Sequence, residues 1–487
     1  MATAQRFPTQ LLYPTKRSRR KSCQQMRRLV ILLIVLLAQL GHAQEQDTLN
    51  LEFAEYLAIV KTYHPLVKQA GLVVDEGSFK LMKARGGFDP KVQADLAEKN
   101  YKGTEYYTIF GAAFKVPTYY GLELNAKYEQ NSGYYLNPQN TVPQDGLYSA
   151  GITLDVTNGI FMSERMATLR QAKIYREQTE LKRDLRAAEV LYDAAVAYFE
   201  WYAAFQELNL YEDFLANADF TLRSVRKQFE AGDKPAVDTL EANINRENRA
   251  IALQQAQLDY LKASLKLSNY LWAENNIPLE ITPRVMPNQE LITEVNSLWI
   301  ASEILAIPTL DQNPKIRSLE YDVQMMEVER KLRLNKLLPD LDLSYNFLME
   351  QPEEWQRLDT DNYKFGLKLS VPLFLRKERG DLQLARIQLQ NSRYDLLHAN
   401  VEIKNKLTSL QNEIVSYRSQ GEKMGALVED YASLVTAERR KFELGDSSLF
   451  LVNSRENYYI SARIKEISLA VKYVKSMASL LKLTTQF

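Results

Sequence analysis

Apolar and polar residues follow two different periods along the chain, and the two patterns occur in the same order in each half. Steps of four and three residues, typical of a coiled-coil helix, place apolar side chains at Leu181, Leu185, Ala188, Tyr192, Ala195, Phe199 and Tyr202. Strict alternation, typical of strands, covers 92–96, 152–156, 341–347 and 365–371. We therefore expect a mainly α-helical chain with short β segments.

Two helical segments are unusually long. No proline interrupts 162–230 or 378–444, and a helix over the first range is ~100 Å long at 1.5 Å per residue. A globular domain has no use for such lengths, whereas a tube that crosses a compartment does. Glycine turns at 232–235 and 445–448 should end both helices and reverse the chain.

The chain is predicted to be an internal duplication. VRKQFEAGD at 225–233 matches ERRKFELGD at 438–446 in six of nine positions, if Lys and Arg count as equivalent. The offset is 445 − 232 = 213 residues. His64-Pro65 and Asn313-Pro314 each start a helix, at an offset of 314 − 65 = 249. The difference, 249 − 213 = 36, predicts an insertion in the first half, within about 97–148.

The duplication divides the chain into parts with the same order of elements: helix, strands, long helix, glycine turn, helix. The predicted parts are a first repeat at 44–272, a proline-rich segment at 273–311 and a second repeat at 312–487. Strands are expected at about 88–157, 339–348 and 363–373, and the last helices of the two repeats at 236–272 and 449–484.

The predicted strands have one apolar and one polar face. This pattern fits strands between lipid and a wet lumen, but alternation alone favours half-buried strands of a soluble sheet. The insertion holds one more alternating run, at 122–128, and 101–135 contains ten Tyr or Phe. These rings fit an aromatic girdle at a membrane interface or the core of an ordinary hairpin, and the role of the insertion stays open.

The N-terminus has the order of a secretory signal. Residues 1–28 carry eight Lys or Arg and no acid, Leu29–Ala38 is entirely apolar, and Gly41-His42-Ala43 is a small-x-small cleavage pattern. The apolar run is far shorter than the ~20 residues of a membrane-spanning helix. We therefore predict a signal peptide at 1–43. Gln44, not Cys, follows it, which argues against a lipoprotein.

Removal of residues 1–43 changes the charge balance. Lys and Arg fall to 61 − 8 = 53 against 61 Asp and Glu, so the net charge becomes about −8, which argues against a nucleic-acid partner. The one cysteine, Cys23, leaves with the signal. No other stretch reaches 18 apolar residues, so entry into a membrane would require β-strands.

Enzyme chemistry has little to draw on. The three histidines lack neighbours at metal-ligand spacing, and neither a glycine-rich phosphate loop nor a G-x-S-x-G elbow is present. We expect no enzyme, no metal and no cofactor, and any energy for transport must come from a partner protein.

Four strands per chain cannot close a membrane barrel, which needs at least about eight. An oligomer is therefore expected, and three chains with four strands each give twelve. The order of elements, the duplicated Phe-Glu-x-Gly-Asp turns and the stretch GDKPAVDTLEA after Gly232 resemble the TolC-type outer-membrane factors. The resemblance covers about residues 48–485.

The resemblance implies a homotrimer with a twelve-stranded β-barrel formed by two duplicated strand pairs per chain, and a tunnel of long antiparallel coiled-coil helices. It implies an equatorial α/β belt, for which 273–311 is the candidate. Such a protein lies in the outer membrane of a Gram-negative bacterium and extends into the periplasm. It is the exit duct of a tripartite efflux pump or type I secretion system, with a periplasmic adaptor and an inner-membrane pump as partners.

The family places a gate and an adaptor site at the glycine turns. Candidate gate residues are Arg226, Asp233, Asp238, Glu241, Arg439, Arg440 and Asp446. Candidate adaptor-docking residues are Gly232, Asp233, Gly445, Asp446 and Ser447. Pore-lining candidates on the strands are Thr153, Asp155, Asp342, Ser344, Asn346 and Lys368. The second half departs from the family at Leu451, where an Asp is common.

Two simpler interpretations remain beside the duct. The charges near the turns are also what solvated helix ends carry, and the whole chain also fits a periplasmic coiled-coil tether with a soluble β-domain. The transported substrate is not encoded in any pattern of the sequence.

Overall fold

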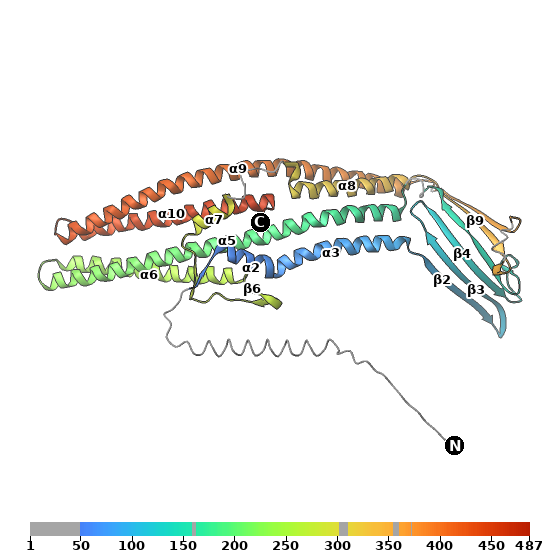
Figure 1. Ribbon diagram of the computed structural model, residues 1–487, viewed down its shortest axis with the longest axis horizontal. Coiled ribbons are helices and arrows are strands. Elements are labelled where there is room, and N and C mark those ends of the chain that lie inside the picture. The colour runs from blue at the N-terminus through green and yellow to red at the C-terminus, as the bar shows by residue number, and fades with distance from the viewer. Residues whose placement is uncertain (1–48, 158–161, 301–309, 354–359, 372) are drawn as a thin grey trace, which may run out of the picture. The chain divides into compact units, whose positions relative to one another are not determined.

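The computed structural model describes residues 49–157, 162–300, 310–353, 360–371 and 373–487 (Figure 1). The predicted signal peptide at 1–43 lies outside the described residues. So do 301–309 of the predicted equatorial segment and position 372 of the strand expected at 363–373.

The chain divides into two compact units. The smaller one comprises Met1–Asn50 and Thr282–Met286, in which the Leu49 amide donates to the Arg284 carbonyl at 3.0 Å. The larger one comprises Leu51–Ile281 and Pro287–Phe487. The larger unit contains every helix and the large sheet described below.

Eight α-helices are described, and two of them are very long. They are α2 (Phe53–Tyr63), α3 (Pro65–Arg85), α5 (Glu164–Glu230), α6 (Ala236–Ser268), α7 (Leu291–Ile300), α8 (Pro314–Asn335), α9 (Arg376–Glu443) and α10 (Leu449–Thr484). α5 has 67 residues and α9 has 68, against expected ranges of 162–230 and 378–444.

The helices of the larger unit lie side by side, four abreast at either end. Nearer the sheet the order is α3, α5, α8 and α9, and nearer the glycine turns it is α6, α5, α10 and α9 (Figure 1). The two long helices run through both parts. α3 and α6 therefore lie at one lateral edge of the chain, and α9 lies at the other.

The middle of α5 carries large side chains that are completely buried. Ala194, Tyr198, Phe199 and Trp201 are fully buried, and Phe53 of α2 packs against the Phe199 ring at 5.0 Å. A helix that is apolar all round must be covered on every side. α2 and α7 supply that cover, which explains why this region carries extra short elements.

α3 and α5 approach closely at Gly77. A Cβ added there would lie 2.7 Å from Oγ1 of the buried Thr179, whereas one added at Gly71 of the same helix meets nothing within 4 Å. Gly77→Ala should therefore destabilise the protein by about 1–3 kcal/mol through overpacking. Gly71→Ala is the control and should stabilise it by about 0.5–1 kcal/mol. Thermal unfolding in detergent measures both, and equal effects would contradict the close approach.

His64 caps α3 with its side chain. Its Nδ1 accepts a hydrogen bond from the Leu66 amide at 3.3 Å, and its ring stacks on Tyr270 at 5.6 Å. Burial lowers the pKa of His64 below its usual value. In the second half, Asn313 caps α8 in the same way, accepting from the amides of Lys315 and Ile316.

His64 makes stability depend on pH. Because its folded pKa is lowered, the unfolded chain binds the extra proton first, near pH 6.5. The contribution of His64 to the free energy of unfolding should be fully present above about pH 6.5. It should decrease as the pH falls below that value, by at most about 1.4 kcal/mol per pH unit. His64→Asn keeps a capping oxygen, as at Asn313, and should remove this loss. Unfolding curves between pH 7 and 5 that stay parallel for both proteins would contradict the assignment.

The large sheet has six antiparallel strands in the order β10-β9-β5-β4-β3-β2. Their bounds are β2 Lys91–Tyr101, β3 Thr104–Pro117, β4 Leu122–Ser132, β5 Leu147–Asp155, β9 Asp340–Met349 and β10 Tyr363–Ser370. The expectation of four strands per chain is wrong, because the insertion itself forms β3 and β4. Short strands β1 (Leu49–Leu51), β6 (Trp272–Ala273), β7 (Ile277–Pro278) and β8 (Val285–Pro287) form two further pairs.

Candidate functional site

The register of the sheet places its polar residues on one face. Thr153 lies opposite Ser344, Asp155 lies opposite Asp342, and Asp342 lies opposite Lys368. Asn346 belongs to the same face, opposite Gly151. All six residues predicted to line a pore are thus brought together on one surface of three neighbouring strands.

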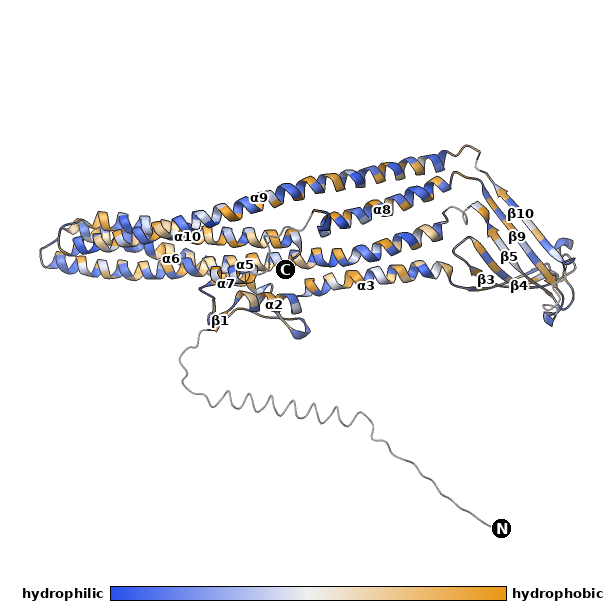
Figure 2. Cartoon of the chain, turned by 45° about the horizontal axis from the view of Figure 1, so that its top comes forward, coloured by the Kyte–Doolittle hydropathy of each residue, from blue (hydrophilic) through white to orange (hydrophobic). Residues whose placement is uncertain are grey.

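The opposite face carries mainly apolar residues from every strand of the sheet, and Figure 2 shows apolar and polar residues following one another along the strands. One row crosses every strand through the successive partners Val92, Phe114, Ala126, Ala150, Phe347 and Tyr363. Many of these side chains are exposed: Val92 is 78% exposed and Leu367 is 61% exposed. A large exposed apolar surface marks an interaction site, here one that is flat and as wide as the sheet.

Aromatic residues gather at both ends of the strands. Tyr119 and Tyr120 lie in the β3–β4 turn, where the Arg170 side chain donates to the Tyr119 hydroxyl at 3.0 Å. At the other end of the strands Tyr134 follows β4 and is 88% exposed, and Tyr106 contacts Tyr135 at 4.7 Å. Tyr120 and Tyr134 are 75% and 88% exposed, which does not fit a buried hairpin core, so these two rings favour the interface girdle of the two interpretations.

The glycine turns lie at the ends of the long helices that are remote from the sheet. Gly232 and Gly445 have φ of +82° and +81°, which only glycine adopts without strain. Beside the turns, all four helices share one apolar cluster, formed by Leu222, Val225, Ala242 and Leu449 with Phe442 packed on it. The helical hairpins α5–α6 and α9–α10 are therefore packed against each other at this end.

Two of the candidate gate residues are engaged inside the chain. Arg439 donates to the Glu456 carboxylate from Nε at 3.0 Å and from Nη2 at 2.6 Å, and the Glu456 side chain is only 5% exposed. Glu241 accepts a hydrogen bond from Asn453 at 3.3 Å. These contacts hold α9 and α6 to α10.

The other candidate gate residues are exposed, except Asp238, which is half-buried. Within the described residues, their side chains make neither a hydrogen bond nor an ion pair; they are Arg226, Asp233, Asp238, Arg440 and Asp446. Of the predicted docking residues, Ser447 donates to Glu438 at 2.5 Å, and both glycines are exposed.

Sequence reasoning missed a ladder of polar contacts between α6 and α10. Asn245 donates to Asn453 at 2.8 Å, and Arg249 donates to Asn457 at 2.7 Å. The sequence did contain a sign that Glu456 of α10 is buried, because Glu456 falls among the apolar residues Leu449, Val452 and Ile460, which are all buried. A charge in an apolar stripe requires a partner.

The described part of the chain has neither a membrane-spanning helix nor a metal site. None of its helices combines the length and apolarity needed to cross a bilayer. No group of His, Cys, Asp or Glu residues in it is arranged to hold a metal ion.

The sequence matches a family model. The model of the outer membrane efflux protein family matches residues 120–271 and 308–486, which is more than half of the chain. The chain belongs to the outer membrane efflux protein family. It is a TolC-type outer-membrane efflux channel that extends into the periplasm, and this is a family of channels rather than enzymes. No curated protein sequence matches the chain.

Solved structures share the fold of this outer membrane efflux protein. The Campylobacter jejuni CmeC outer membrane channel is 13% identical, with a TM-score of 0.63, and the match covers 89% of this chain and 85% of that one. CusC is 14% identical, with a TM-score of 0.63 and coverage of 91% and 95%. The open-state Neisseria gonorrhoeae MtrE channel is 12% identical, with a TM-score of 0.60 and coverage of 91% and 93%.

Proposed function

We propose that three copies of this efflux protein join side by side into a passive exit duct. A periplasmic adaptor docks at the glycine turns, and an inner-membrane pump of a tripartite efflux or type I secretion system supplies the energy. The proposal rests on the two lateral edges of the chain. Each edge presents a sheet strand with one described neighbour and a helix with an exposed apolar stripe.

The sheet is open on both sides. Among the described residues, β2 and β10 have a strand neighbour on one side only, so each presents a row of backbone donors and acceptors. Val92 of β2 and Leu369 of β10 are 78% and 61% exposed. Open edges of this length pair with another chain unless something blocks them.

α6 carries an unpaired coiled-coil seam along the same edge as β2. Its apolar residues recur every seven positions and are exposed by 45–64%: Val237, Ile244, Ile251, Leu258 and Leu265. A strict seven-residue repeat requires a second helix. No described helix of the larger unit covers this stripe, so it supports packing against another copy.

α9 carries a similar seam along the edge of β10. Ile387, Tyr394, Val401 and Val415 are spaced by seven residues or a multiple of seven, and they are exposed by 56–70%. The two seams are on different surfaces, so copies must associate head to tail. Such contacts close into a ring when the rotation is right.

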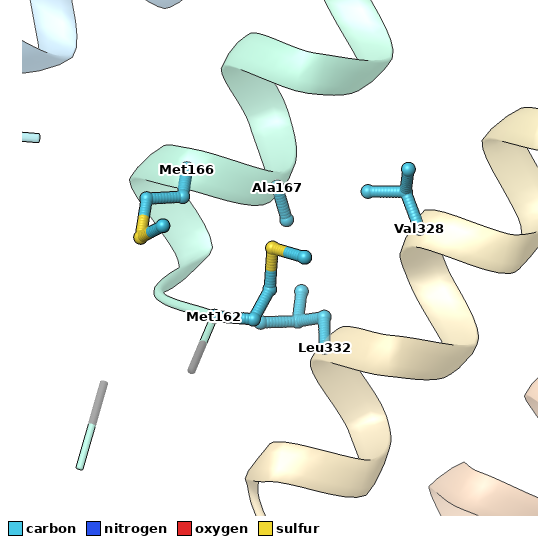
Figure 3. Packing of buried hydrophobic residues seen from close by; sticks show 5 residues of the cluster. All are labelled: Met162, Met166, Ala167, Val328 and Leu332. Carbon is cyan, nitrogen blue, oxygen red and sulfur yellow. The ribbon is translucent and has the colours of Figure 1, made fainter. Parts of the chain in front are cut away.

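The proposed duplication supplies a template for the contact between copies. Within the chain, Ala167 of α5 points toward Val328 of α8, in a cluster with Met162, Met166 and Leu332 (Figure 3). The repeat offsets convert Ala167 to Gly380 (167 + 213) and Val328 to Phe79 (328 − 249).

Both equivalent positions are available for a neighbour. Phe79 on α3 is 63% exposed, and Gly380 on α9 is exposed. Met162 converts by the same offset to Leu375, which stands directly before α9. We expect α9 of one copy to pack on α3 of the next as α5 packs on α8 within the chain.

The duct itself is passive in this proposal, and the hydroxyl, amide and charged side chains on the polar face of the sheet can line a wet passage. We assign Thr153, Asp155, Asp342, Ser344, Asn346 and Lys368 to that lining. The outward-facing charges at the turns, Asp233 and Asp446 above all, are the gate candidates that remain free to meet another copy or the adaptor.

Single-channel conductance in a planar bilayer tests the function. Protein extracted from membranes with detergent should give stable openings. The double variant Asp233→Ala and Asp446→Ala should open more widely or more often, because it removes charge at the narrow end. Arg223→Ala, exposed on α5 one turn before Arg226, is the control and should leave the openings unchanged. A protein that needs no detergent and gives no openings would refute the duct.

A further inference from the structure

The inserted hairpin β3–β4 stands inside the sheet and not beside it. Resting on the association of three copies proposed above, we infer that each chain gives all six strands to the wall. Three copies then close a barrel of 3 × 6 = 18 strands, and neighbouring copies join through β2 of one and β10 of the next.

The hairpin is fully paired on both sides. β3 pairs with β2 from Lys91 to Tyr101, with one irregularity between Lys99 and Asn100. β4 pairs with β5 from Leu122 to Glu129. Since β2 and β5 do not touch each other, the sheet cannot close across the insertion as it would in a four-stranded design.

One row of residues on each face continues through the hairpin from β2 to β5. Phe114 and Ala126 continue the apolar row between Val92 and Ala150. The polar row beside it also crosses every strand, through the successive partners Lys91, Lys115, Asn125, Gly151, Asn346 and Lys364. Strands that only capped a pore would have no reason to keep this register.

The width of the sheet agrees with the width of the helical layer. Four helices, α3, α5, α8 and α9, stand next to the sheet, and at 8–10 Å each they occupy between ~32 and ~40 Å of wall. Six strands spaced by 4.8 Å and tilted by about 40° occupy ~38 Å, whereas four occupy only ~25 Å. Six strands thus continue the helical wall without a constriction.

The strand directions also allow closure. All neighbours in the sheet are antiparallel, and an even number of strands per chain makes β2 antiparallel to β10 of the next copy. Because barrel diameter grows roughly linearly with strand number, the outer mouth is about half again as wide as a twelve-stranded one. The exit barrel therefore adds no size filter of its own.

Cysteine cross-linking in intact outer membranes tests the strand number, since the only cysteine, Cys23, lies in the predicted signal peptide. The pairs Ala94→Cys with Ala112→Cys and Ala126→Cys with Ala150→Cys join β2 to β3 and β4 to β5. A short bifunctional thiol reagent should link each pair at least tenfold more than the control pair Ala94→Cys with Ala150→Cys. The two cysteines of the control pair can be cross-linked only if β2 lies directly beside β5.

The contact between copies is scanned separately, with Leu96→Cys combined in turn with Phe365→Cys, Leu367→Cys or Leu369→Cys. At least one pair should give cross-linked dimers and trimers. Linkage of β2 to β5 would overturn the eighteen-stranded wall while leaving the trimer intact. Trimers linked along the helices but never between β2 and β10 would also overturn it. Absence of any link between copies would overturn the proposed association together with the strand number.

Discussion

Ile152→Arg should abolish assembly of the channel in the outer membrane, with the assembled protein reduced at least tenfold. Ile152 lies on the apolar face of β5, one of the two central strands, opposite Leu124 on β4 and Tyr345 on β9. Arginine at the middle of a bilayer costs about 2–4 kcal/mol, and each factor of ten in an equilibrium corresponds to about 1.4 kcal/mol. The penalty recurs in every copy of the oligomer.

The neighbouring variant Thr153→Arg is the matched control. Thr153 belongs to the polar face and lies opposite Glu123, so an arginine there meets a carboxylate and water. We expect normal assembly. Quantifying each variant in detergent extracts of outer membranes decides the comparison, with the total amount synthesised as reference.

The comparison also separates a membrane sheet from a soluble one. Ile152 is already 44% exposed in the single chain, so in a soluble sheet its replacement by arginine would be nearly neutral. Equal amounts of both variants in the membrane extract would therefore contradict a lipid-facing surface.

Arg439→Ala should destabilise the glycine-turn end by about 3 kcal/mol. The change leaves the Glu456 carboxylate buried without its ion-pair partner, which typically costs about 3–5 kcal/mol. We expect the lower end of that range, because the Arg439 side chain is itself 36% exposed. Thermal unfolding in detergent measures the loss, and Arg439→Ala with Glu456→Leu should recover most of it.

Arg440→Ala is the control for this prediction. Arg440 is exposed and, within the described residues, its side chain has no ion pair, so its removal should change stability by less than about 0.5 kcal/mol. If Arg439→Ala instead enlarged the conductance without lowering stability, Arg439 would belong to the gate and not to the hairpin core.

The long helices were predictable because their apolar residues keep one period over many turns. Ala188, Ala195 and Phe199 fall on the predicted seam and are buried. The glycine turns were equally visible, since Gly232 and Gly445 must adopt a positive φ. In both cases local geometry and chain length suffice, without knowledge of any distant contact.

The strand number was not predictable in the same way. β3 has Ile109, Gly111 and Ala113 on its polar face, so its sequence does not alternate and gives no strand signal by period. Only pairing with β2 and β4 shows which of its residues face which side. The strands β3 and β4 lie within the range predicted for the insertion, but the place of these strands in the sheet depends on hydrogen bonds between segments far apart in the chain.

The candidate gate residues show a second limit of prediction from the sequence. Charge near a turn is visible in the sequence, but its partner is not. Arg439 and Arg440 are adjacent and chemically identical, yet only Arg439 meets a buried carboxylate, because helix rotation turns it toward α10. Which charges remain free for another copy depends on packing.

In the proposed assembly, the two open edges of each chain bind the edges of neighbouring copies in a closed ring of three. The most direct test is cross-linking of Phe79→Cys with Gly380→Cys in intact membranes, with each single variant as control. We expect a ladder of monomer, dimer and trimer that stops at three and is absent from both single variants. No product, or a ladder that continues beyond three, would contradict it.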